Sequence, residues 1–123
     1  MKRVLLVDDG CTERKYYSGV LEEGGLTVKV AANGYEAWEK ALAEAFDVMV
    51  VDVNMPKLDG LSLIRILRRE GENGEVPVLV LSSEDSPSGR DRALAAGAER
   101  YLVKPVSPRV LQAAVIELME GTP

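Results

Sequence analysis

The segment FDVMVVDVNMPKLDG, residues 46–60, joins an apolar strand to a charged end. Its apolar run, residues 48–51, is typical of a strand that is buried on both faces of a parallel sheet. The run ends at Asp52, and residues 54–60 have the composition of a turn rather than of further core. Because a carboxylate at the end of a buried strand is costly unless it is paired or used, Asp52 is the first candidate functional residue.

The rest of the chain alternates between apolar runs and capped, amphipathic segments. We expect strands at residues 4–7, 26–31, 48–51, 76–81 and 100–103, and helices that begin near Thr12, Gly34, Asp59, Pro87 and Pro108. The predicted side-chain caps of these helices are Thr12, Ser86 and Ser107. Five strand–helix units predict an α/β, doubly wound, five-stranded parallel sheet with five helices on its two faces. At 123 residues, the chain is expected to form a single domain over residues 1–123.

Composition excludes several classes of function. The net charge of -5 makes nucleic acid an unexpected direct partner, and no apolar run approaches the length of a membrane span, so we expect a cytoplasmic protein without a membrane partner. The chain has no histidine, which excludes histidine-based catalysis and histidine metal ligands within it. Its single cysteine, Cys11, is expected to be a free thiol.

Polar side chains follow four of the five predicted strands. These are Asp8 and Asp9 after the first, Asp52 at the third, Ser82 and Ser83 at the fourth and Lys104 after the fifth, whereas the second ends in Ala31 and Ala32. A flavodoxin-like strand order of 2-1-3-4-5 puts the second strand at an edge and the other four around one crevice. Oxygen-only ligands in that crevice favour Mg²⁺, with Mn²⁺ as the alternative ion.

This set of residues suits phosphoryl transfer. Asp52 would be the nucleophile, and Asp8 and Asp9 would hold the metal ion. Lys104 would supply a cation and Ser82 a hydroxyl to the phosphoryl oxygens. The alternative for the acidic pair is a turn and helix cap, and for Lys104 a solvated lysine before a proline turn.

The ordered set resembles the receiver domain of response regulators, the CheY-like family of two-component signalling. The resemblance spans essentially the whole chain. It rests on Asp8-Asp9, on residues 52–56 (DVNMP) followed by Asp59-Gly60, on Ser82-Ser83, on Tyr101 and on Lys104-Pro105. It implies that Asp52 accepts a phosphoryl group from a phosphohistidine on a histidine kinase or histidine phosphotransfer protein, which agrees with a chain that lacks histidine.

The resemblance also implies a metal site. Asp9 and Asp52 would ligate Mg²⁺ together with the backbone carbonyl of Asn54, while Asp8 would act through water. Lys104 would pair with the phosphoryl group, and the peptide bond before Pro105 is commonly cis in the family.

A switch is implied as well. On phosphorylation, Ser82 would bond a phosphoryl oxygen and Tyr101 would turn inward, so that the change is read by an unknown downstream protein on the face of the fourth helix, fifth strand and fifth helix. Ser82 stands where threonine is frequent, and it keeps the hydroxyl without the methyl group that restricts the rotamer. Asn54 and Glu84 occupy positions that tune dephosphorylation, as in chemotaxis receivers, which implies a short-lived signal.

We therefore expect a stand-alone phosphoacceptor switch, because the sequence ends at Pro123 just after the last predicted helix. We also expect it to be a monomer or a weak phosphorylation-dependent dimer. It would be no enzyme beyond its own phosphorylation and dephosphorylation. Alternatives are a phosphorylation-independent adaptor of the same fold and a Mg²⁺-dependent aspartyl-phosphate phosphatase, although residues 52–54 lack a second acid to protonate a leaving group. A flavin-binding relative is disfavoured, because Asp8 and Asp9 would repel a phosphate.

Overall fold

The computed structural model describes residues 2–55, 57–70 and 73–121, so Pro56 of the predicted turn and the terminal Pro123 lie outside the described residues. The five strands form one parallel sheet in the order β2-β1-β3-β4-β5, which confirms the predicted topology. The strands are β1 (Arg3–Val7), β2 (Thr27–Ala31), β3 (Val48–Asp52), β4 (Val78–Ser82) and β5 (Arg100–Val103). The helices are α1 (Cys11–Glu23), α2 (Gly34–Ala43), α3 (Gly60–Arg69), α4 (Pro87–Ala96) and α5 (Pro108–Glu120).

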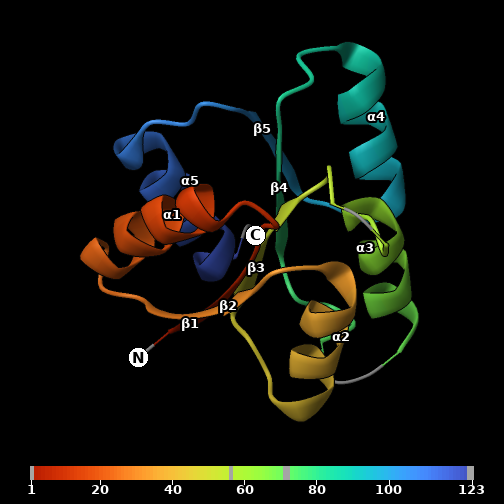
Figure 1. Ribbon diagram of the computed structural model, residues 1–123, viewed down its shortest axis with the longest axis horizontal. Coiled ribbons are helices and arrows are strands. Elements are labelled where there is room, and N and C mark those ends of the chain that lie inside the picture. The colour runs from red at the N-terminus through yellow and green to blue at the C-terminus, as the bar shows by residue number, and fades with distance from the viewer. Residues whose placement is uncertain (1, 56, 71–72, 122–123) are drawn as a thin grey trace.

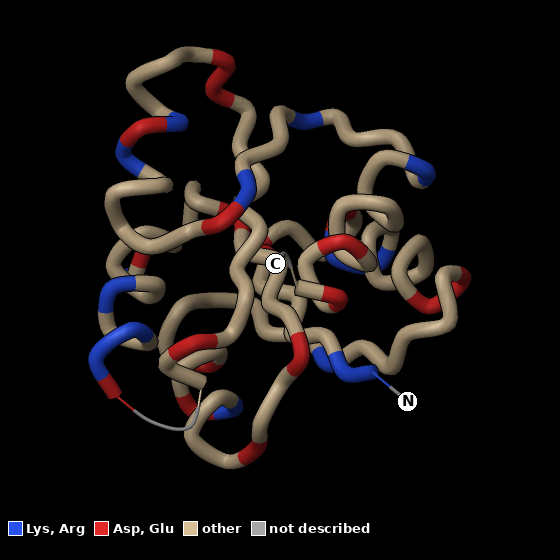
Figure 2. The backbone as a smooth tube through the Cα atoms, turned by 180° about the vertical axis from the view of Figure 1, so that it is seen from behind, with Lys and Arg blue, Asp and Glu red and all other residues tan. Residues whose placement is uncertain are grey.

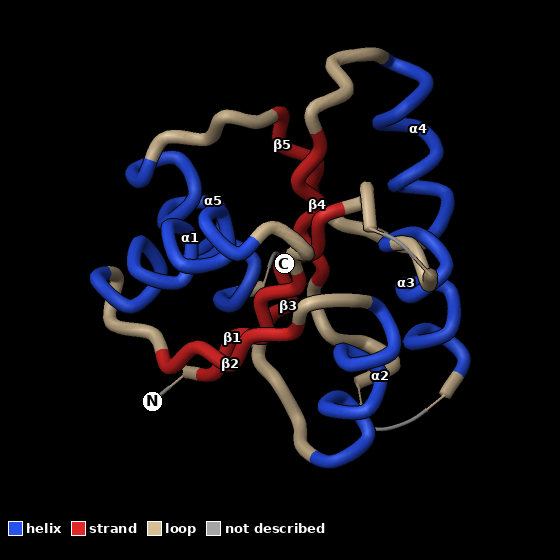
Figure 3. Tube along the Cα trace, viewed as in Figure 1, coloured by secondary structure: helices blue, strands red, loops and turns tan. Residues whose placement is uncertain are grey.

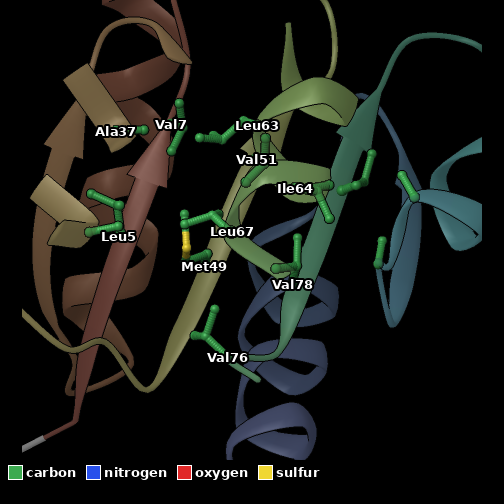
Figure 4. Packing of buried hydrophobic residues seen from close by; sticks show 14 of the residues in the cluster. Leu5, Val7, Ala37, Met49, Val51, Leu63, Ile64, Leu67, Val76 and Val78 are labelled. Carbon is green, nitrogen blue, oxygen red and sulfur yellow. The ribbon is translucent and has the colours of Figure 1, made fainter. Parts of the chain in front are cut away.

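Helices cover both faces of the sheet. Helices α1 and α5 lie on one face and α2, α3 and α4 on the other (Figures 1 and 3). The side chains of β1 alternate between the two layers: Leu5 and Val7 join the cluster under α2 and α3, whereas Val4 and Leu6 join the cluster under α1 and α5. Figure 4 shows the first of these clusters, in which Leu67 of α3 points toward Met49 of β3. All five residues of β3 are buried, so the predicted fully covered strand is confirmed.

Side-chain caps begin four of the helices, and two of them, Ser86 and Ser107, confirm predicted caps. The caps are Asn33, Asp59, Ser86 and Ser107, and each accepts a hydrogen bond from a backbone N–H three residues later. The predicted cap at Thr12 is wrong, since α1 begins at Cys11 after Gly10. Gly10 is the N-cap residue instead: its carbonyl oxygen accepts the Arg14 N–H at 2.8 Å, and its own N–H donates to Asp8 Oδ1 at 2.9 Å.

Basic and acidic residues are interspersed along the backbone (Figure 2). In the described part of the chain, no helix is long and apolar enough to cross a membrane.

Asn73 holds the loop before β4 against the end of α2. Its side chain is 3% exposed; Oδ1 accepts from the Phe46 N–H at 2.9 Å, and Nδ2 donates to the carbonyl oxygens of Ala41 at 2.7 Å and Glu44 at 3.1 Å. No sequence pattern predicted this role, because an asparagine beside glycines is typical of an ordinary solvent-exposed turn.

Asn73→Ala is therefore expected to lower the free energy of unfolding by about 2–3 kcal/mol, because buried backbone groups at Phe46 and Ala41 lose their partner. Urea unfolding measures the change. Glu75→Ala, an exposed position in the same turn, is the control and should change stability by less than about 0.5 kcal/mol. Equal losses in the two variants would contradict the structural role of Asn73.

Candidate functional site

The predicted site residues lie at the carboxyl edge of the sheet. Asp8 and Asp9 follow β1, Asp52 ends β3, Ser82 ends β4 and Lys104 follows β5. Val7 pairs in register with Val51, so Asp8 and Asp52 leave adjacent strands at the same level. Carboxylate oxygens of Asp8, Asp9 and Asp52 all lie within 4.8 Å of one another. The structure thus brings together the three acids that the sequence analysis assigned to one crevice.

Backbone amides orient the two buried acids. Asp8 is 1% exposed and Asp52 is 4% exposed. The Gly10 N–H bonds one oxygen of Asp8, and the Asn54 N–H donates to Asp52 Oδ1 at 3.1 Å. The second oxygen of Asp8, Oδ2, is buried and has no hydrogen-bond partner among the residues that the structure describes. A buried carboxylate oxygen without a donor is costly, which indicates that the site is built for a further group.

Lys104 reaches into this cluster from the loop after β5. Its Nζ lies 3.5 Å from Asp52 Oδ2 and 3.6 Å from Asp8 Oδ2, and it donates a shorter bond of 2.7 Å to Glu13 Oε2 on α1. The Lys104–Pro105 peptide bond is cis, as the family resemblance implied. The lysine is therefore a paired, largely buried cation and not the solvated side chain of the alternative interpretation.

Burial dominates the ionisation of the acids. It raises the pKa of Asp52 and of Asp8 above the ordinary aspartate value; the backbone N–H bonds and Lys104 oppose this shift in both, and neighbouring carboxylates add to it. Repulsion between the acids, which the sequence analysis emphasised, is thus the lesser cause. Burial lowers the pKa of Lys104, but its bond to Glu13 and the charges of Asp52 and Asp8 outweigh it, so the net shift is upward.

The donor set fits a hard divalent cation. All three acids supply oxygen, which Mg²⁺ and Mn²⁺ prefer, and one buried oxygen of Asp8 lacks a donor. Asp8, Asp9 and Asp52 are the residues that would hold such an ion. The backbone of Asn54 lies in the same turn, since its N–H bonds the Asp52 side chain.

Two predicted switch residues meet at the backbone of Glu84. Ser82 is 1% exposed, and its Oγ accepts the Glu84 N–H at 3.0 Å. The Tyr101 hydroxyl donates to the Glu84 carbonyl oxygen. The Tyr101 ring is already buried in this structure, at 8% exposure. The loop between β4 and α4 is therefore held at one residue by both Ser82 and Tyr101.

The carboxylate of Glu84 is engaged with α4. It accepts the Ser86 hydroxyl bond and pairs with Arg92, whose guanidinium lies 3.0 Å from Glu84 Oε1. No sequence pattern predicted the pairing of Arg92 with Glu84 or of Glu13 with Lys104. A charged residue on a helix is usually solvated, so neither position carries a signal in a single sequence. Cys11 is an exposed free cysteine at the start of α1, as expected.

Asp52→Asn is expected to stabilise the protein in EDTA near pH 7 but not near pH 3. The folded-state pKa of Asp52 is raised, so between the unfolded and folded values the folded protein binds more protons, and stability falls as pH rises through that interval. Asparagine carries no charge into the buried site. The free energy of unfolding of the variant should therefore exceed that of the wild type by an amount that grows with pH across the interval and then levels off. Urea unfolding of both proteins at several pH values measures it, and an advantage that shrinks with rising pH would contradict the assignment.

The fold and the acids together define a class of protein. A parallel sheet of order 2-1-3-4-5, with a carboxylate cluster and a lysine at the carboxyl edge, is the arrangement of a receiver domain. The chain belongs to the response regulator receiver domain family, whose sequence profile matches residues 4–116. Receiver domains of two-component systems take phosphoryl groups from histidine kinases.

Relatives and solved structures agree with this membership. The response regulator MprA of Mycobacterium ulcerans is 41% identical over 120 residues, which cover 98% of this chain and 51% of MprA. The chain thus spans about half the length of this relative. Chemotaxis protein CheY4 of Vibrio cholerae is 37% identical with a TM-score of 0.89, covering 94% of this chain and 97% of CheY4.

A third neighbour bears on the metal. The receiver domain of the sensor histidine kinase PA1611 from Pseudomonas aeruginosa PAO1 is 28% identical with a TM-score of 0.91, and the match covers 98% of each chain. That structure has a magnesium ion coordinated in the active site cleft.

Proposed function

We propose that this receiver domain is a phosphoacceptor switch in which Asp52 takes a phosphoryl group from a phosphohistidine on a histidine kinase or histidine phosphotransfer protein. The observation that carries the proposal is the buried Asp52 carboxylate, with Lys104 Nζ 3.5 Å away and two further acids beside it. Residues 1–123 contain no histidine, so the phosphohistidine donor lies outside them.

In the proposed reaction, an oxygen of Asp52 attacks phosphorus, and the bond from phosphorus to the donor imidazole breaks. The electron pair of that bond returns to the imidazole nitrogen, and an acyl phosphate forms on Asp52. A bound Mg²⁺, held by Asp8, Asp9, Asp52 and the Asn54 carbonyl, would neutralise charge on the phosphoryl oxygens. The Lys104 ammonium supplies the second positive charge, since it already lies beside Asp52.

The proposed signal passes through the backbone of Glu84. When the Ser82 hydroxyl turns to bond a phosphoryl oxygen, it leaves the Glu84 N–H. The Glu84 carbonyl, which accepts the Tyr101 hydroxyl bond, then moves with the loop. Tyr101 lies on β5 and the loop leads into α4, so the change reaches the face of α4, β5 and α5, where an unknown downstream protein reads it.

The domain would turn over no external substrate. It catalyses only its own phosphorylation and dephosphorylation, and Asn54 and Glu84 tune the attack of water on the acyl phosphate. We place it in the cytoplasm as a monomer or a weak phosphorylation-dependent dimer. The interspersed charges give no support to a direct nucleic-acid partner (Figure 2).

Incubation with acetyl phosphate and Mg²⁺ tests the proposal. Intact-protein mass spectrometry should show the addition of a single phosphoryl group, which hydroxylamine removes because an acyl phosphate is an activated anhydride. EDTA should prevent the labelling. A protein that binds Mg²⁺ but gains no phosphoryl group, or whose modification resists hydroxylamine, would contradict the proposal. Hydrolysis of phosphomonoesters by the purified domain would instead favour the phosphatase alternative.

A further inference from the structure

The shortest polar contact of Lys104 leads away from the acid cluster. Nζ lies 2.7 Å from Glu13 Oε2, compared with 3.5 Å to Asp52 and 3.6 Å to Asp8. A distance of 2.7 Å is that of a charge-assisted hydrogen bond, whereas the two longer distances are those of ion pairs without one. The ammonium is thus bonded to α1 rather than to the acid that the proposed function phosphorylates.

Glu13 is held less firmly than the acids of the cluster. Backbone N–H groups orient Asp8 and Asp52 from within their own turns. Glu13 lies in the first turn of α1 with a side chain that is 51% exposed, and Lys104 is its only hydrogen-bond partner in the described part of the chain. A half-exposed, flexible carboxylate can return to water at little cost, so this contact is the one that yields when Lys104 moves.

We propose that Glu13 is an internal competitor for Lys104, an inference that rests on the proposed function. In the unphosphorylated protein the Glu13 carboxylate holds the ammonium away from Asp52, and it is displaced when Lys104 bonds the phosphoryl oxygens. A phosphoryl group carries up to about two negative charges, so it outcompetes a single carboxylate. Glu13 therefore lowers the stability of the phosphorylated state, and its release breaks the contact between α1 and the loop after β5.

The opposite role, in which Glu13 positions Lys104 for the phosphoryl group, predicts the opposite sign. A positioning residue would hold Nζ within hydrogen-bonding distance of Asp52, and the 3.5 Å separation does not do so. Removal of a competitor tightens binding at Asp52, whereas removal of a positioning residue weakens it.

The test is a titration of the Mg²⁺-loaded protein with beryllofluoride, which mimics a phosphoryl group on an aspartate, followed by amide chemical shifts in NMR spectra. Glu13→Gln should bind about three-fold more tightly, the size expected for one partly exposed ion pair. Glu23→Gln removes the same charge from the far end of α1 and should bind like the wild type. Unchanged or weaker binding by Glu13→Gln would overturn the inference.

Glu13→Asp separates direct competition from a general effect of charge. It keeps the negative charge but is one methylene shorter, so it should also bind beryllofluoride more tightly. If only Glu13→Gln binds beryllofluoride more tightly, the effect comes from the charge of Glu13 in general, and direct competition for Lys104 is overturned.

A second readout needs neither metal nor beryllofluoride. The ¹⁵Nζ resonance of Lys104 should shift in both Glu13 variants and not in Glu23→Gln, and an unshifted resonance would overturn the contact between Glu13 and Lys104. If the wild type binds no beryllofluoride, the phosphoacceptor proposal fails together with this inference, whereas equal binding by all variants overturns this inference alone.

Discussion

Asp52→Asn is expected to abolish phosphorylation of the domain by acetyl phosphate. Asparagine keeps the shape of the side chain and can still accept the Asn54 N–H bond, but its amide is a poor nucleophile and cannot form the acyl phosphate. Mass spectrometry of the intact protein should show no added phosphoryl group under conditions that label the wild type fully. The loss of phosphorylation is complete rather than partial, because a carboxylate oxygen of Asp52 would itself form the new bond to phosphorus.

Asp59→Asn is the matched control. Asp59 lies in the loop after β3, where its carboxylate caps α3 by accepting the Ser62 N–H at 2.9 Å. Asparagine caps helices about as well as aspartate, so the fold is kept and labelling should persist. Hydroxylamine-labile labelling that survives in Asp52→Asn, or disappears in Asp59→Asn, would move the phosphoacceptor away from Asp52.

Gly60→Ala is expected to destabilise the domain by about 2 kcal/mol or more and to disturb the site at the same time. A Cβ at Gly60 would lie 2.6 Å from the Asp52 carbonyl oxygen, 2.9 Å from Val53 Cα and 3.0 Å from Val51 Cγ1. The first two of these atoms are backbone, which cannot move aside without displacing the end of β3. The free energy of unfolding should therefore fall in urea, and phosphorylation of Asp52 should slow.

Gly19→Ala makes the same substitution where space is free. Gly19 lies within α1, and a Cβ added there meets nothing within 4 Å. Alanine has the higher helix propensity, so this variant should gain about 0.5–1 kcal/mol and keep its phosphorylation rate. The free energy of unfolding is thus expected to fall in Gly60→Ala and to rise in Gly19→Ala. A stable Gly60→Ala domain would show that the close approach of α3 to β3 is not required.

The sequence predicted the fold well because its signals are local. Examples are the apolar run of β3, the caps at Ser86 and Ser107, and the prolines after these caps, each of which acts within a few residues. The cap at Thr12 failed for a different reason. Helix α1 begins at Cys11, one residue before Thr12, and the Gly10 N–H that precedes it donates to the carboxylate of Asp8 after β1.

The sequence by itself determined the alternation of strands and helices, the strand order, and the convergence of Asp8, Asp9, Asp52 and Lys104 at one edge. In a parallel sheet, all carboxyl ends meet at the same edge, so residues after different strands become neighbours without further information. The tertiary structure alone decided which groups bond one another there. The pairing of Lys104 with Glu13, the hold of Ser82 and Tyr101 on Glu84, and the burial of Asn73 depend on side-chain directions. Those directions follow from packing between elements distant in the chain, and no local pattern encodes them.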